Sequence, residues 1–123
     1  MEVGETLLVE TRQAWRAWLA EHHHTKAEIW LINYKKSSVK RSLDYDSALD
    51  EALCFGWIDG QIKGVNAEYF VARWSRRRSG SNWSASNRAR ARRLIDVGLM
   101  TQAGITAFPP DLRAELGLEP GKR

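Results

Sequence analysis

The sequence of 123 residues contains a single cysteine, Cys54. One cysteine excludes an internal disulfide and any metal site built from four thiolates, so the fold needs nothing from an oxidising compartment. Long apolar runs are also missing, since no stretch approaches the roughly 18 apolar residues of a membrane span. The opening MEVGETLLVE lacks the basic-then-apolar order of a secretory signal. We therefore expect a cytoplasmic protein without a membrane span.

Negative charge is missing from one segment of the chain. Residues 73–93 contain eight arginines and no lysine, aspartate or glutamate. The whole chain has a net charge of only +4, from 19 basic and 15 acidic residues. A local excess of one sign creates a directed field that such a net charge hides, and it singles out this segment as a candidate working surface.

Aromatic residues, in contrast, are abundant. Six tryptophans, three tyrosines and three phenylalanines occur in a chain with the length of one ordinary domain. Each large ring removes on the order of 150 to 250 Å² from water when it is buried. The stability of the domain should therefore depend strongly on aromatic packing.

The apolar pattern predicts an α+β fold. Residues 6–10, 28–36, 56–65 and 68–75 have strand character, and the short turn VNA makes an antiparallel hairpin of the last two. The strand at 28–36 is apolar on both faces, so we expect it to be central and covered on both sides. Helices are predicted at 11–23, 45–55 and 84–97. Together these elements form a small, mainly antiparallel sheet of about four strands packed with three main helices.

The predicted helices have capping residues at the expected places. Thr11 precedes the first helix, Asp44 or Asp46 the second, and Ser84 or a neighbour the third, which Gly98 ends. Residues 101–108 and 111–117 add short helical turns, interrupted by Pro109 and Pro110.

Several motifs resemble one known family. ALCFGWIDG (52–60) and RRSGSNWSASNRARARRLIDVGLMTQAG (77–104), preceded by WRAWLAEHH and IWLINYKK, look like the YdeI/OmpD-associated family, also called bacteriocin-protection proteins. The resemblance implies this fold and a role in resistance to bacteriocins or antimicrobial peptides, without an established reaction. Two departures are visible. Ser75 and Arg76 stand where the family usually has Thr-Pro or Ser-Pro, and FPPDLRAEL is similar to the start of a second module that members often contain.

The resemblance also suggests the domain division. We expect one domain over residues 1–108 and a C-terminal tail over 109–123, which is similar to the start of a truncated second module.

The arginine-rich segment has the pattern of a folded helix. Ala91, Leu94, Ile95 and Gly98 share one face, and the arginines surround that stripe. A flexible arm would keep neither the stripe nor Trp83. Two interpretations of the arginines stay open. They either form ion pairs with the acidic helix at 44–51 and remain hydrated, or they receive an anionic partner through their planar guanidinium groups.

Our leading hypothesis is a non-catalytic binding domain for an anionic small molecule or an acidic peptide. The predicted ligand-binding residues are Trp57, Asp59, Arg73, Arg77, Arg78, Trp83, Ser84, Asn87 and Arg88. The first alternative is a nucleic-acid-binding domain, in which Trp74 and Trp83 would stack on bases. The second alternative is an enzyme that uses Cys54 as a nucleophile, which requires a base or cation close to the thiol.

Neither a metal nor a cofactor is expected. His22, His23 and His24 are the only histidines, and consecutive side chains on a helix point in different directions, so they do not share one ion easily. Asp59 lies on the polar face of its predicted strand, beside the face that carries Arg73. We expect it to be a structural carboxylate that accepts from Trp83, Ser84 or an arginine.

Overall fold

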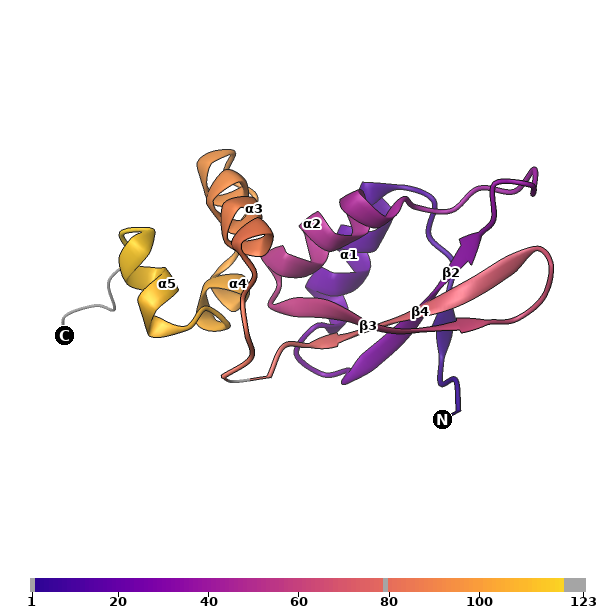
Figure 1. The fold of residues 1–123 in the computed structure, drawn as a ribbon, viewed down its shortest axis with the longest axis horizontal. Helices are drawn as coiled ribbons and strands as arrows, with labels where there is room; N and C mark the ends of the chain where they lie inside the picture. The colour runs from indigo at the N-terminus through magenta and orange to yellow at the C-terminus, as the bar shows by residue number, and fades with distance from the viewer. Residues whose placement is uncertain (1, 79, 119–123) are drawn as a thin grey trace.

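The computed structural model describes residues 2–78 and 80–118, which form a four-stranded sheet and five helices (Figure 1). The strands are β1 (Thr6–Leu7), β2 (Glu28–Tyr34), β3 (Trp57–Gly64) and β4 (Tyr69–Arg76). The helices are α1 (Arg12–His22), α2 (Tyr45–Cys54), α3 (Ala85–Asp96), α4 (Gln102–Thr106) and α5 (Pro110–Glu115). The predicted α+β class, the sheet of four strands and the three main helices are confirmed.

The sheet has the strand order β1-β2-β4-β3. Pairing is antiparallel between β2 and β4 and between β4 and β3, while β1 runs parallel to β2. The predicted hairpin and the central position of β2 are thus confirmed. The first strand is shorter than expected, two residues instead of five. A register shift between Asp59 and Ile62 marks a bulge in β3, which breaks the simple alternation read from the sequence.

The helices are distributed unevenly around the sheet. Figure 1 shows α1 and α2 against one face, and α3, α4 and α5 beyond the end where β3 begins and β4 finishes. The opposite face carries Trp30 and Val71, which are buried but do not belong to the main core cluster. The expected burial of β2 on both faces therefore holds for Trp30, although the helices cover only one face.

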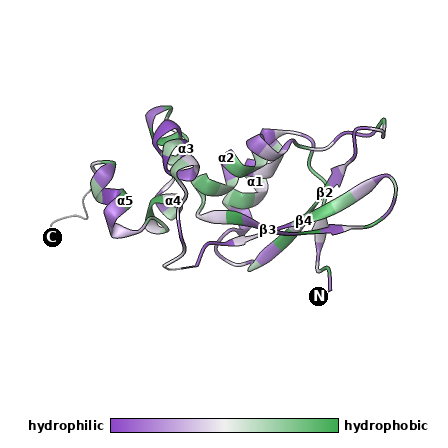
Figure 2. Ribbon diagram, viewed as in Figure 1, coloured by the Kyte–Doolittle hydropathy of each residue, from purple (hydrophilic) through white to green (hydrophobic). Residues whose placement is uncertain are grey.

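Aromatic side chains fill the space between α1, α2 and the sheet. Trp15 stacks on Trp18 with ring centroids 5.6 Å apart, and the edges of Trp74 and Trp57 meet these two rings. The Trp15 indole donates to the Ala48 carbonyl at 2.9 Å, which satisfies its buried polar atom. Figure 2 shows the hydrophobic segments of α1 and α2 where they face the sheet, whereas α3 and α5 are more hydrophilic.

The predicted helix caps are present. Thr11, Asp44 and Ser84 each accept a hydrogen bond, at 3.0 to 3.1 Å, from the backbone N–H three residues later. Gly98, with φ +81°, follows α3 and permits the left-handed turn that ends it. These caps fix where α3 begins and therefore where the loop before it must run.

The segment after α3 packs onto the end of α2. The Thr101 hydroxyl and backbone N–H both donate to the Cys54 carbonyl, at 2.5 and 3.2 Å. A Cβ at Gly104 would lie 2.5 Å from the same oxygen, so α4 approaches α2 too closely for any other residue. In α5, Leu112 is fully buried in the same core cluster as Phe108. The predicted division at residue 108 stays a prediction.

Within the described residues, no helix combines the length and the apolar character needed to cross a membrane.

Candidate anion-binding cleft

Seven of the eight arginines in residues 73–93 fall into two groups; the eighth, Arg92, is exposed on α3 and does not line the cleft. Some are paired with carboxylates: Arg73 with Glu28, Arg88 with Asp111 and Glu115, Arg90 with Asp46 and Asp50, and Arg93 with Asp50. Arg76, Arg77 and Arg78 instead line a cleft. The ion-pair interpretation is therefore confirmed for Arg90 and Arg93, which contact the acidic helix α2, and it leaves the three consecutive arginines to be explained.

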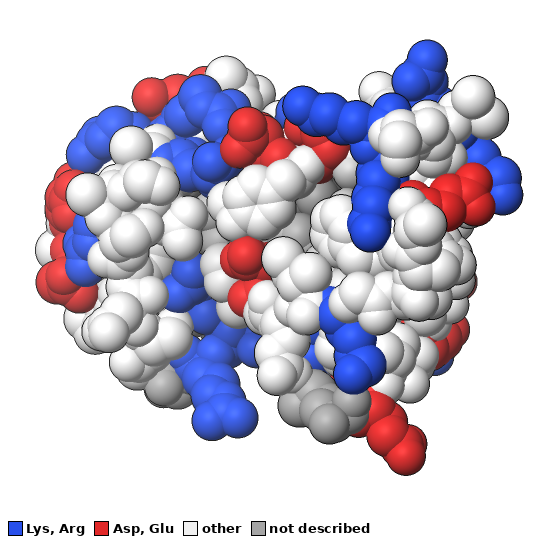
Figure 3. All heavy atoms as spheres, turned by 45° about the vertical axis from the view of Figure 1, so that its right-hand side comes forward, with Lys and Arg blue, Asp and Glu red and all other residues white. Residues whose placement is uncertain are grey.

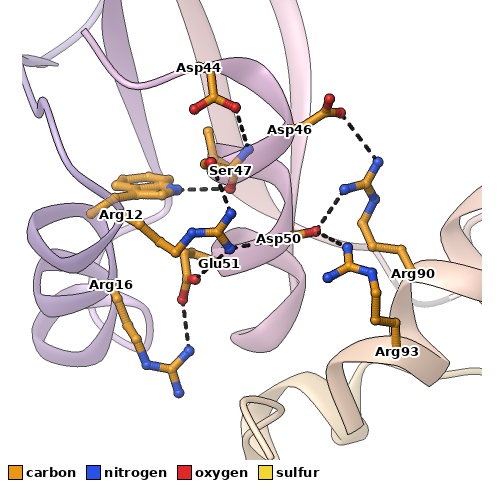
Figure 4. Close-up of polar contacts among 11 residues, drawn as sticks. Arg12, Arg16, Asp44, Asp46, Ser47, Asp50, Glu51, Arg90 and Arg93 are labelled. Carbon is orange, nitrogen blue, oxygen red and sulfur yellow. Dashed lines mark hydrogen bonds and ion pairs between the residues drawn. The ribbon is translucent and has the colours of Figure 1, made fainter. Parts of the chain in front are cut away.

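The paired group includes a network that joins three helices. Asp50 and Glu51 of α2 are only 4% and 1% exposed. Figure 4 shows Arg12 and Arg16 reaching them from α1 and Arg90 and Arg93 reaching Asp50 from α3. The shortest of these contacts, from Arg90 Nη1 to Asp50 Oδ1, is 2.7 Å, and that from Arg16 Nη1 to Glu51 Oε1 is 2.8 Å. We call these six residues the α2 network.

The arginines of the α2 network stabilise the charged form of its central carboxylate, Asp50. Burial by itself would raise the pKa of Asp50, but hydrogen bonds from Arg90, Arg93 and Arg12 outweigh burial and hold the pKa below its ordinary value. Asp50 therefore stays ionised when the protein is folded. Because each carboxylate contacts at least two guanidinium groups, the network fixes α1 and α3 to α2 and leaves these arginines little freedom to bind a ligand.

The unpaired group lies around a cleft of about 690 Å³. Its walls come from the end of α1, the end of α2, the end of β4 with the loop that follows, and the segment from α4 to α5. The described lining residues are His23, His24, Phe55, Gly56, Arg76, Arg77, Arg78, Gly80, Ser81, Trp83, Ala103, Thr106, Ala107, Phe108, Pro109, Pro110 and Arg113. Four arginines occur in this lining, and none of its described residues is an aspartate or glutamate.

Arg77 occupies the most enclosed position among these arginines. Its guanidinium carbon lies 3.9 Å from the centroid of the Trp83 ring. Nη1 donates to Ser81 Oγ and to the Asn82 carbonyl, both at 3.0 Å. Burial lowers the pKa of Arg77, and the negative charge of Asp59 offsets only part of this effect. An aromatic face and neutral oxygens thus hold the cation where the α2 network would use carboxylates.

The structure around Arg77 explains how the loop is shaped. Trp83 is 9% exposed and meets Phe108 edge to face, with ring centroids 5.3 Å apart. Ser84 then caps α3. The loop is therefore anchored on both sides of Trp83, and the guanidinium of Arg77 is placed by packing against a ring that is itself fixed.

The other arginines of the cleft have only neutral partners among the described residues. Arg76 donates to the His24 carbonyl at 3.3 Å, and Arg113 donates to the Thr106 carbonyl at 3.4 Å. Arg78 is exposed. A carbonyl oxygen orients a guanidinium without neutralising it, so the cleft keeps its positive charge.

Two histidines at the end of α1 complete the polar lining. The Nδ1 atom of His23 lies 2.8 Å from the Leu19 carbonyl. Because a carbonyl oxygen can only accept, this contact places a proton on Nδ1 and leaves Nε2 as the second polar atom of the ring. The His23 ring also packs beside Phe55, with centroids 5.3 Å apart.

Three of the nine predicted ligand-binding residues meet in the cleft: Arg77, Arg78 and Trp83. Ser84 and Asn87 lie next to it in sequence but form the start of α3, where Ser84 Oγ accepts from the Asn87 backbone. Arg88 turns away and binds Asp111 and Glu115, at 2.8 and 3.0 Å. These three residues are not in the cleft lining.

The remaining predicted residues, Trp57, Asp59 and Arg73, lie in other places. Trp57 is fully buried in the core, and its indole donates to the His23 carbonyl at 3.3 Å. In the sheet, Asp59 of β3 lies opposite Trp74 of β4, whereas Arg73 of β4 lies opposite Trp30 of β2. Since neighbouring side chains of a strand point to opposite faces, Arg73 lies on the far side of the sheet from Trp74.

Two details predicted for Asp59 are wrong. It was expected on the polar face of its strand, beside the face that carries Arg73, but the bulge after it changes the alternation. Its expected donors were Trp83, Ser84 or an arginine, but the donor found is the Tyr45 hydroxyl, at 3.0 Å from Oδ2. The expectation that it serves as a structural hydrogen-bond acceptor fits this contact.

The residues that other segments contribute to the cleft were not predicted from the sequence. His23, His24 and Phe55 come from helix ends, Phe108 comes from the last position of the expected domain, and Arg113 comes from the segment assigned to a tail. The histidines were considered only as metal ligands. A usable signal was the spacing of the apolar residues Ile105, Phe108 and Leu112, which indicates that this segment packs on the domain.

Cys54 is fully buried behind the α2 network. Burial raises the pKa of its thiol to about 11, against the opposing effect of a hydrogen bond with Arg16. A thiol with this pKa is protonated near neutral pH, which is the reverse of what a nucleophilic cysteine needs. Among the described residues, no group of three or more His, Cys, Asp and Glu side chains could hold a metal ion.

Charges of both signs are mixed on the face of the molecule that Figure 3 shows. Basic and acidic side chains are interspersed there with neutral surface and do not form one continuous basic stripe. This face therefore differs from the described lining of the cleft, which has arginines and no carboxylate.

The fold and the site define an α+β domain with an arginine-lined cleft. The chain belongs to the family described as a domain of unknown function, DUF8412, whose model matches residues 7–107. Neither the curated proteins nor the solved structures include a match to the chain. The resemblance to the YdeI/OmpD-associated family stays a prediction from the sequence.

Proposed function

We propose that this protein is a non-catalytic binding domain that takes a small anionic ligand into the cleft. The observation that carries the proposal is the charge of the lining: four arginines and, among its described residues, no carboxylate. The α2 network shows how this fold treats arginines that serve structure alone, because it pairs them with buried carboxylates. An anion is the missing partner that the chemistry of the cleft calls for.

The position of Arg77 supports the same conclusion. Its guanidinium is packed on Trp83 and oriented by two neutral oxygens. A cation that is oriented before the ligand arrives loses less conformational freedom on binding than a mobile one does. Its planar shape also suits the two oxygens of a carboxylate or phosphate.

The rival functions receive less support. A nucleic-acid-binding surface needs several cations along a track, but Arg88, Arg90 and Arg93 are engaged by carboxylates, and Trp74 is buried. An acidic peptide would place one carboxylate side chain in the cleft. Such a peptide would be bound by the same arginines as a small anion. The burial and raised pKa of Cys54 argue against a cysteine-dependent enzyme.

The proposed physiological role and the proposed cellular location are based on the sequence. A role in resistance to bacteriocins is implied by the YdeI/OmpD-associated resemblance, and a basic cleft would meet an acidic component more readily than a cationic peptide. We propose a cytoplasmic location, because the single cysteine excludes an internal disulfide and the fold needs nothing from an oxidising compartment.

Thermal unfolding with anions tests this function. Phosphate, sulfate, citrate and benzoate are added at constant ionic strength to the wild type and to the Arg77→Ala and Arg78→Ala variants. A ligand at about 100 times its Kd stabilises the native state by about 2.7 kcal/mol. We expect at least one anion to raise the midpoint of the wild type and to have much less effect on either variant.

Arg41→Ala is the matched control, since Arg41 is exposed and does not line the cleft. This variant removes the same charge and should keep the full shift. The proposal fails if no anion moves the wild-type midpoint, or if Arg41→Ala loses as much of the shift as Arg78→Ala does. Because Arg78 is exposed, its replacement reports on binding without disturbing the fold.

A further inference from the structure

The cleft has two chemically different walls. The end of β4 and the loop after it supply Arg76, Arg77 and Arg78. The segment from α4 to α5 faces the cleft mainly with apolar side chains, which are Ala103, Ala107, Phe108, Pro109 and Pro110. A ligand that fills such a space has a charged end and an apolar body.

The charge of the basic wall exceeds that of a single carboxylate. Three guanidinium groups belong to this wall and a fourth, Arg113, comes from α5, so a monovalent anion would leave most of their charge unbalanced. A phosphate monoester has a charge of about −1.5 to −2 at pH 7 and three strong acceptor oxygens. Both described hydrogen bonds of the Arg77 guanidinium start from Nη1, and no acceptor for Nη2 is found among the described residues.

The volume of the cleft argues for more than a bare phosphate ion. At about 690 Å³, it is in the range that small-molecule sites occupy. Inorganic phosphate would fill one end and leave the apolar wall in contact with water. A flat ring placed against Ala107, Pro109 and Pro110, which are half-buried or exposed, would remove that apolar surface from water, which favours binding.

We infer that the ligand is a phosphate monoester joined to a flat apolar group, with the phosphate at Arg76–Arg78 and the ring against the α4–α5 segment. This inference rests on the proposed function and adds the class of ligand. Two kinds of compound share the chemistry: aryl phosphates, in which the ring adjoins the phosphate, and nucleoside monophosphates, in which a sugar separates them.

Isothermal titration calorimetry with matched compounds tests the inference. Phenyl phosphate and AMP represent the two kinds, benzoate supplies the ring with a single charge, and inorganic phosphate supplies the charge without a ring. At constant ionic strength and pH 7.5, we expect phenyl phosphate or AMP to bind about tenfold or more tightly than both benzoate and inorganic phosphate. The preference between phenyl phosphate and AMP then shows whether the ring lies next to the phosphate or is separated from it by a sugar.

The other outcomes separate this inference from the proposed function. If benzoate binds as tightly as phenyl phosphate and AMP, or inorganic phosphate does, the ligand class is wrong while the anion-binding function stands. If none of the four compounds binds, the ligand class is wrong, and the anion-binding function falls as well if sulfate and citrate also leave the thermal midpoint unchanged. Tighter binding of an unrelated single-stranded oligonucleotide, with a steep loss of affinity in salt, would overturn the inference in favour of a nucleic-acid partner.

The variants locate the effect. Arg77→Ala and Arg78→Ala should each lower the affinity for phenyl phosphate by about tenfold, as expected for the loss of one charge-assisted contact. Arg41→Ala should bind like the wild type. Equal affinities in all four proteins would overturn the assignment of the phosphate to Arg76–Arg78, even if phenyl phosphate binds.

Discussion

The α2 network and the cleft use the same side chain in opposite ways. In the network, Arg12, Arg16, Arg90 and Arg93 converge on two nearly buried carboxylates. In the cleft, Arg77 rests on an indole, and Arg76 and Arg113 donate to carbonyl oxygens. The first arrangement gives every guanidinium a carboxylate partner and joins helices. The second orients charge and leaves it available.

This difference shows why a count of arginines does not identify a binding surface. Leaving a buried carboxylate without a partner is expensive, so the arginines around Asp50 and Glu51 are explained by structure alone. No such explanation covers Arg76, Arg77 and Arg78. A ligand is expected where arginines line a cleft whose described residues include no carboxylate.

The largest expected effect comes from removing the centre of the network. Asp50→Ala should lower the free energy of unfolding by about 2 to 4 kcal/mol, because three arginines lose a common partner that is nearly buried. Urea denaturation measures this change. Asp46→Ala is the control, since its exposed contact with Arg90 spans 3.5 Å and should contribute about 0 to 1 kcal/mol. Equal losses in the two variants would mean that the network does not hold the helices together.

Acid should weaken the network in a defined direction. The folded protein holds the pKa of Asp50 below its ordinary value, so the unfolded chain binds this proton more readily. The stabilisation is fully present above the unfolded pKa of about 3.9 and is lost as pH falls through the folded pKa. Urea midpoints measured between pH 7 and 2.5 should therefore fall more steeply for the wild type than for Asp50→Asn. Parallel curves would assign the acid sensitivity to other carboxylates.

A single substitution can give Arg77 a carboxylate partner, as the arginines of the α2 network have. Ser81 Oγ already accepts from Arg77 Nη1 at 3.0 Å, so Ser81→Asp would offer that guanidinium a carboxylate. We expect phenyl phosphate to bind about tenfold more weakly, while the free energy of unfolding is unchanged or slightly raised. Ser81→Asn, which adds no charge, should keep most of the affinity. Unchanged binding in Ser81→Asp would show that Arg77 is not a ligand contact.

The sequence patterns predicted the elements well because local rules determine them. Thr11, Asp44, Ser84 and Gly98 bound the helices as expected, and the apolar run of β2 identified the central strand. Only part of the site was predicted from the sequence. Arg77, Arg78 and Trp83 could be predicted because they are close together in the sequence. Its other members come together through the packing of α4 on α2, which depends on a close approach at Gly104 that no periodicity reveals.

The misplaced residues have equally specific causes. Asp59 and Arg73 were assigned to adjacent faces because the bulge in β3 was not anticipated. Arg88 was assigned to the ligand, but its partners Asp111 and Glu115 belong to a segment that was expected to be a tail. Charge partners that are distant in sequence decide whether an arginine is available, and a single sequence does not provide them.

The smallest expected effect concerns Cys54. Although Arg16 lies close to it, the thiol is fully buried and its pKa is about 11. Iodoacetamide at pH 7.5 should therefore leave Cys54 unmodified in the native protein and alkylate it in urea. Alkylation of the native protein as fast as that of a free thiol would reopen the possibility of a cysteine-dependent enzyme.

Arginine side-chain NMR compares the two regions in one experiment. In ¹⁵N-labelled protein titrated with phenyl phosphate, we expect the Nε–H signal of Arg77 to shift until it saturates, while the signals of Arg12 and Arg93 stay in place. The account is contradicted if the Arg77 signal does not move at a saturating concentration of ligand, or if Arg12 and Arg93 show the larger shifts.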